Sequence, residues 1–148
     1  DAISDVTDVP GRYGDEPLGT RAVQLSDASV RSDALDILGR CARQGSCESS
    51  PAPTGALPRK LHLFNGDLLN ARISNPDSRL QTMLRAGTAP TVIVREHYRI
   101  ALGRRPSSDE AAFWQEQVAE ATSDVERRAV LEDFVWGLLS SSEFQTNH

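Results

Sequence analysis

Two stretches near the end of the chain have the sequence of a helix-capping box. Ser107 to Glu110 and Ser123 to Glu126 both read Ser-x-x-Glu. In that motif the serine hydroxyl and the glutamate carboxylate each accept a hydrogen bond from a backbone N–H that the helix leaves unpaired. Acidic side chains in both first turns also suit the positive end of the helix dipole. The end of the chain is therefore expected to form two consecutive helices, with carboxylates that cap rather than catalyse.

Apolar residues recur at helical spacing before these two helices as well. Further helices are predicted over residues 29–38, 58–73, 78–86 and 88–102. Gly39, Gly87 and Gly103 follow three of them, and glycine is the usual residue where a helix ends in the left-handed conformation. The sequence therefore predicts an all-α fold of about five or six short helices, packed as an irregular bundle.

The start of the chain has a different composition. Residues 1–28 are rich in Asp, Gly and Pro and predict an extended arm, in which Arg21–Leu25 alternates apolar and polar residues and could form one short strand. A short helix and a Pro/Gly/Ser loop follow over 29–57, and 58–148 is the expected compact helical body. A length of 148 residues suits one domain. Because the chain begins at Asp1 and not at Met, we expect it to be an excised piece of a longer precursor.

Charge and hydropathy exclude two classes of partner. The formal net charge is −5, with basic residues concentrated in 31–105 and acidic residues in 106–148. The bases are spread over several segments without interleaved aromatic residues, so we expect no nucleic-acid binding. No apolar run approaches the length of a membrane span, so we expect no membrane insertion.

Few residues suggest chemistry. A candidate polar or binding cluster comprises His62, Asn65, Asp67, Asn70 and Arg104. The amide and carboxylate side chains of this cluster on helix 58–73 could coordinate a cation, although such groups more often cap and bridge loops. His62 lies beside an apolar stripe, where a structural histidine is the usual explanation. We expect no catalytic residue, no metal and no cofactor.

The two cysteines do not match a known metal or haem motif. Cys41 and Cys47 lie six positions apart, without the C-x-x-C or C-x-x-C-H spacing of zinc or covalent haem sites. They would form a local disulfide in an oxidising compartment and remain thiols in a reducing one. The sequence leaves both alternatives open.

Several strings together resemble a known family. They are Gly19–Leu25, Leu38–Arg40, Leu61–Gly66, Tyr98–Pro106, Leu131–Phe144 and the ending Asn147–His148. In this order they resemble the C-terminal part of the planctomycete-type domain of unknown function numbered 1553, which usually follows a cytochrome c-like segment in large secreted proteins. The most specific part of the resemblance is a C-terminal signature that includes Trp136, Glu143, Phe144 and Asn147, for which we expect a packing role. We expect Trp136 to be buried.

The resemblance implies an exported parent protein but no reaction. It therefore favours a non-catalytic structural or interaction module, located outside the cytoplasmic membrane, whose partners are other domains of the same precursor. The alternative is a carbohydrate-binding or hydrolytic role in the breakdown of extracellular polymers. A pocket shared by His62, Asn65, Asp67 and Arg104 would favour that alternative.

Overall fold

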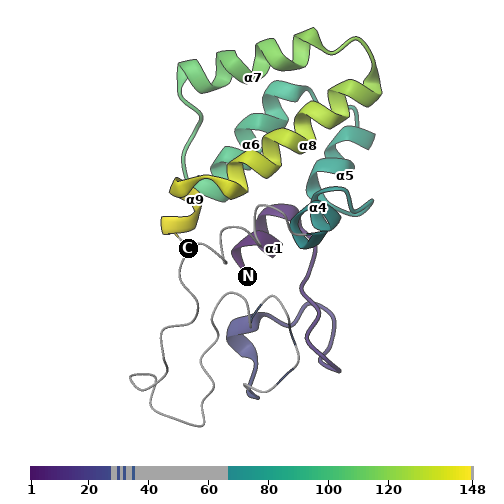
Figure 1. Ribbon diagram of the computed structural model, residues 1–148, viewed down its shortest axis with the longest axis vertical. Coiled ribbons are helices and arrows are strands. Elements are labelled where there is room, and N and C mark those ends of the chain that lie inside the picture. Colours follow the sequence, from purple (N-terminus) through teal and green to yellow (C-terminus); the bar gives the residue numbers. More distant parts are fainter. Residues whose placement is uncertain (28–29, 31, 33–34, 36–66, 148) are drawn as a thin grey trace. The chain divides into compact units, whose positions relative to one another are not determined.

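The computed structural model describes residues 1–27, 30, 32, 35 and 67–147 (Figure 1). The chain divides into two compact units, one formed by Asp1 with Pro10–Leu68 and the other by Ala2–Val9 with Leu69–His148. The described residues form an all-α fold without a strand. Its elements are α1 (Ala2–Thr7), the 3-10 helix η1 (Ala22–Gln24), α4 (Asp67–Ile73), α5 (Arg79–Arg85), α6 (Pro90–Leu102), α7 (Ser108–Glu120), α8 (Asp124–Ser140) and α9 (Ser142–Asn147).

Local sequence signals place the ends of α5 and α6. The Ser78 hydroxyl accepts a hydrogen bond from the backbone N–H of Gln81 at the start of α5. Pro90 occupies the first turn of α6, where its missing N–H leaves no helical bond unmade. Gly103 ends α6 with a φ of 68°, a left-handed conformation that glycine adopts without steric strain.

The two predicted capping boxes start α7 and α8, although the second box is incomplete. Ser107 and Glu110 bond reciprocally, with the Ser107 N–H donating to the carboxylate at 2.7 Å. At α8 the Ser123 hydroxyl caps the N–H of Glu126. The Glu126 carboxylate instead accepts from both the N–H and the hydroxyl of Thr122, at 2.7 Å each. Hydrogen bonds from the Thr122 hydroxyl and N–H are the largest causes that lower the pKa of Glu126.

The core of the second unit forms around α6 and α8. Helix α6 contacts α1, α7, α8 and α9. Phe134 of α8 is completely buried and contacts the rings of His97, Tyr98 and Trp114. The remaining buried side chains of this core are Val6, Leu69, Ile73, Leu80, Ile93, Val94, Ala101, Val118, Leu131, Val135, Leu138, Leu139 and Phe144.

The expected extended arm is wrong for its first residues, because Ala2–Thr7 form helix α1. Val6 is 1% exposed and belongs to the core. Arg79 of α5 donates hydrogen bonds to the backbone carbonyls of Val6 and Asp5, which the short helix cannot pair internally. Six residues are too few for a stable isolated helix, so tertiary contacts are what form α1. The compact helical unit is therefore Ala2–Val9 with Leu69–His148, not residues 58–148 alone.

The expected short strand is also wrong. Within the first unit, residues 22–24 form η1, and the Asp1 carboxylate accepts from the N–H groups of Ala22 and Val23 at 2.8 and 3.2 Å. A carboxylate capping these N–H groups favours a helical turn over an extended strand. The predicted helix over 29–38, the loop that follows it and residues 58–66 lie outside the described residues, apart from positions 30, 32 and 35.

Candidate functional site

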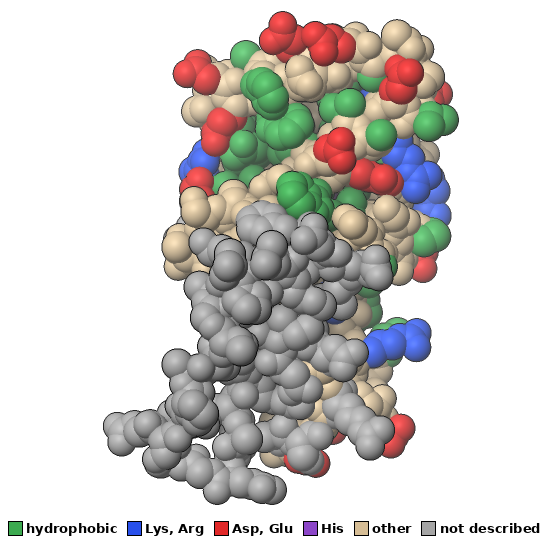
Figure 2. All heavy atoms as spheres, in the orientation of Figure 1, with side chains coloured by type: hydrophobic (Ala, Val, Ile, Leu, Met, Phe, Trp, Pro, Cys, Tyr) green, Lys and Arg blue, Asp and Glu red, His purple; other side chains and the backbone are tan. Residues whose placement is uncertain are grey.

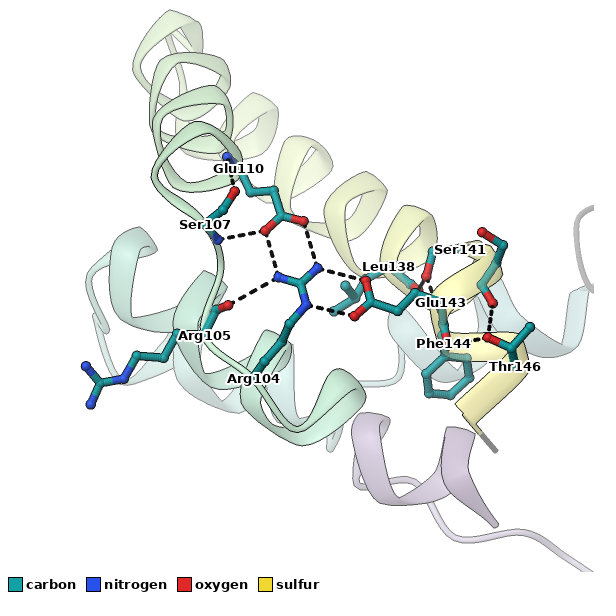
Figure 3. Close-up of polar contacts among 10 residues, drawn as sticks. Arg104, Arg105, Ser107, Glu110, Leu138, Ser141, Glu143, Phe144 and Thr146 are labelled. Carbon is teal, nitrogen blue, oxygen red and sulfur yellow. Dashed lines mark hydrogen bonds and ion pairs between the residues drawn. The ribbon is translucent and has the colours of Figure 1, made fainter.

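Arg104 is the centre of the most extensive polar cluster in the described part of the second unit. It follows the left-handed turn at Gly103 and lies between the start of α7 and α9 (Figure 3). Its guanidinium bonds both carboxylate oxygens of Glu110, at 2.8 and 2.9 Å, and both of Glu143, at 2.7 and 2.8 Å. The remaining N–H of Nη1 donates to the carbonyl of Arg105 at 3.2 Å.

These contacts use every donor that Arg104 has. A guanidinium carries five N–H groups, and the two forked carboxylates and one carbonyl accept all five. The Arg104 guanidinium carbon also lies 5.2 Å from the ring centroid of Tyr98, within the range of a cation–π contact. Arg104 therefore joins α6, α7 and α9, and none of its N–H groups is left to hold a ligand.

The same contacts shift the pKa values of Arg104, Glu110 and Glu143. Hydrogen bonds from Arg104 are the largest cause that lowers the pKa of Glu110 to about 2, with the Ser107 cap adding to the effect. Hydrogen bonding to Arg104 likewise lowers the pKa of Glu143, and the two carboxylates raise the pKa of Arg104. All three side chains are partly exposed, so solvent screens these interactions. The cluster is charged throughout the physiological pH range and behaves as a structural clamp.

The five residues predicted as a polar cluster do not form a described site. Arg104 is saturated by Glu110 and Glu143, and Asn70 is exposed on α4. His62, Asn65 and the side chain of Asp67 lie outside the described residues, as do Cys41 and Cys47.

The C-terminal signature contributes to packing in three different ways. Phe144 is buried in the core, Glu143 pairs with Arg104, and Trp136 is partly buried against the core. The expectation that Trp136 is buried is therefore met only in part. Asn147 ends α9, and its side chain lies outside the described residues.

His97 is a buried residue that was not among the expected core positions, although it lies three positions after Val94 and four before Ala101 on the apolar side of α6. It is 1% exposed, its Nδ1 lies 2.9 Å from the carbonyl oxygen of Ile93, and its ring meets the edge of Phe134. Burial is the largest cause that lowers the pKa of His97; the hydrogen bond to the Ile93 carbonyl opposes it, and Arg79 and Glu96 have smaller effects of opposite sign. The neutral ring fits a core position better than a site open to substrate. Its helical spacing from Val94 and Ala101 was the signal that could have placed His97 in the core.

One apolar groove lies among the described residues of the second unit, between α6, α7 and the start of α8. We call it the α6–α7 groove. It encloses about 370 Å³ and is lined by Pro90, Thr91, Val94, Pro106, Ala111, Trp114, Gln115, Val118, Ala119, Ala121 and Arg127. Sequence reasoning missed it because its walls come from three helices, and only their packing places these residues together.

The described residues contain neither a membrane-spanning helix nor a cluster of metal ligands. No helix among them is long and apolar enough to cross a membrane. No group of three or more His, Cys, Asp or Glu side chains there is arranged to hold a metal ion.

The comparisons with known proteins identify no relative. No protein-family model matches the chain, and neither a curated protein nor a solved structure is detectably similar to it.

Proposed function

We propose that the chain is a non-catalytic interaction module of a larger exported protein, and that it packs against other domains of the same precursor. The observation that carries this proposal is an exposed aromatic residue held in a fixed position. Phe113 of α7 is 52% exposed, and its ring lies edge-on to Trp114 at 5.0 Å between ring centroids. Trp114 in turn meets Phe134 of the core at 5.0 Å.

This row of three rings supports a contact role for Phe113. A large aromatic side chain that is already ordered loses little conformational entropy when a partner covers it, and aromatic residues are common anchors of interfaces. Figure 2 shows hydrophobic side chains gathered on the visible face of the second unit, with both acidic and basic side chains around them. Helix α7 itself carries acidic side chains and no Lys or Arg, which favours a partner surface with an apolar centre and a basic rim.

The state of Arg104 also supports an interaction module over the alternative. Carbohydrate binding or hydrolysis at the predicted polar cluster would need donors from Arg104, and all five are engaged within the chain. Glu110 and Glu126 at the starts of α7 and α8 likewise accept hydrogen bonds from backbone N–H groups at these helix starts.

Amide hydrogen exchange in the longer precursor tests the proposal. If α7 packs against a neighbouring domain, its amides exchange more slowly in the precursor than in the isolated chain. A Phe113→Asp variant of the precursor should restore fast exchange, because a buried unpaired charge opposes the contact. Ala112→Asp is the matched control, since Ala112 is the exposed neighbour of Phe113 on α7. Equal exchange of α7 in the precursor and the isolated chain, or equal effects of the two variants, would contradict the proposal.

A further inference from the structure

The α6–α7 groove has the size and lining of a small-molecule site. Its volume of about 370 Å³ falls within the range of roughly 300–1,000 Å³ that is usual for such sites. Most of its lining is apolar, and the indole of Trp114 forms part of the wall. Phe113, which carries the proposed interaction, is not part of the lining, so the groove is a separate feature.

The groove has one polar end. The short connection from Gly103 to Ser107 turns the chain back, so α6 and α7 run antiparallel and the start of α6 lies opposite the end of α7 (Figure 1). Thr91 of α6, Ala121 after α7 and Arg127 of α8 therefore belong to one end of the groove. Pro106 and Ala111 belong to the other end, which offers only apolar contacts.

Arg127 is the only ionisable residue in the lining. Its Nη1 donates to the carboxylate of Asp124 at 2.6 Å, while its Nε and Nη2 have no partner among the residues the structure describes. The Asp124 side chain is 95% exposed, and an ion pair this open to solvent contributes little stability. Arg127 can therefore bond a second carboxylate without giving up a strong internal contact.

We propose that the α6–α7 groove binds a small apolar carboxylic acid. The carboxylate lies at Arg127, and the apolar part extends past Trp114 and Val118 towards Ala111. Charge complementarity selects the anion, because the lining offers one cation and no acid. This inference does not rest on the proposed interaction function, and either can fail without the other.

The test uses three probes that share one apolar group and differ in charge: 4-phenylbutyrate, 4-phenylbutanol and 4-phenylbutylamine. Binding is followed by NMR through the indole N–H signals of the two tryptophans, assigned with the Trp136→Phe variant. Trp114 lines the groove and Trp136 does not, so Trp136 is an internal control. We expect saturable shifts of the Trp114 signal, with the acid bound most tightly and the amine most weakly.

Two variants locate the site. Arg127→Gln should weaken binding of the acid about tenfold and leave binding of the alcohol unchanged, since only the charged hydrogen bonds are lost. Arg128→Gln is the matched control, because Arg128 pairs with Glu132 and lies outside the lining. Ala119→Leu should abolish binding of both the acid and the alcohol by filling the groove.

The inference is overturned by any of four results. These are an unsaturable Trp114 response to 4-phenylbutyrate, an amine that binds as tightly as the acid, equal effects of the Arg127 and Arg128 variants, and unchanged binding in Ala119→Leu. The results on variants count only where the variant keeps the native circular dichroism spectrum.

Discussion

Replacing Val6 with alanine tests whether the first residues of the chain are part of the core. Val6 is 1% exposed in the second unit and packs within its hydrophobic cluster. The change removes two buried methyl groups, worth about 1.6 kcal/mol at roughly 0.8 kcal/mol each. The cavity left behind adds to this loss, whereas the higher helix propensity of alanine returns about 0.5 kcal/mol. We expect a net loss of about 2 kcal/mol in the free energy of unfolding.

The matched control is the same substitution at an exposed position. Val125 lies in the first turn of α8 and is 78% exposed. Val125→Ala should change the free energy of unfolding by less than about 0.5 kcal/mol. Comparing the two variants removes the propensity difference, because both valines lie in helices.

Urea unfolding followed by circular dichroism measures both variants. We expect Val6→Ala to lower the urea concentration at the unfolding midpoint, while the dependence of the free energy of unfolding on urea concentration stays the same. The melting temperature should fall by about 4–8 °C. If the two variants change the free energy of unfolding by amounts that agree within about 0.5 kcal/mol, α1 does not contribute to cooperative unfolding. That result would refute the assignment of α1 to the core.

The remaining predictions concern the charged and titratable residues. Arg104→Lys should lower the urea midpoint at low salt and lower it less at high salt, because lysine keeps the charge but lacks the fork that bonds both Glu110 and Glu143. Urea unfolding at two salt concentrations measures this, and an unchanged midpoint of the lysine variant would contradict the clamp. The pKa of Glu110 is lowered to about 2, so its stabilising contribution is complete above pH 4.5 and is lost as the pH falls towards 2. Glu110→Gln should therefore flatten the pH dependence of stability in that window, and an unchanged profile would refute the assignment. The pKa of His97 is lowered by burial, so the unfolded chain takes up a proton first and stability declines as the pH falls below about 6.5. His97→Gln should remove that decline between pH 7 and 5 in thermal melts, and a decline of the same size in the variant would show that other groups cause it.

The sequence predicted those helices whose ends are specified by neighbouring residues. Ser78, Ser107 and Ser123 cap the starts of α5, α7 and α8, and Gly103 ends α6. These signals act within one helical turn, through hydrogen bonds to nearby N–H groups or through a local backbone conformation. They can therefore be read without knowing the fold.

The candidate site could be predicted only in small part. Glu110 was expected to cap α7, and it does bond Ser107. It also bonds Arg104, which lies in the loop between α6 and α7, and helical spacing does not predict contacts of loop residues. Glu143 was expected to pack, yet it pairs with Arg104 from 39 positions away. The α6–α7 groove depends in the same way on which faces of three helices meet.

The sequence by itself determined the all-α class and the helices α5 to α8, because capping and apolar periodicity are local properties of the chain. Helix α4 likewise lies within the helix predicted over 58–73. Tertiary structure decided the features that follow. Residues 2–7 are helical because Arg79 bonds their carbonyls from 73 positions away and the core takes up Val6. Helical spacing places His97 on the apolar side of α6, and packing alone decides that Phe134 of another helix covers it. Such contacts join residues that are far apart in sequence, and they stabilise the structure only once the helices have packed.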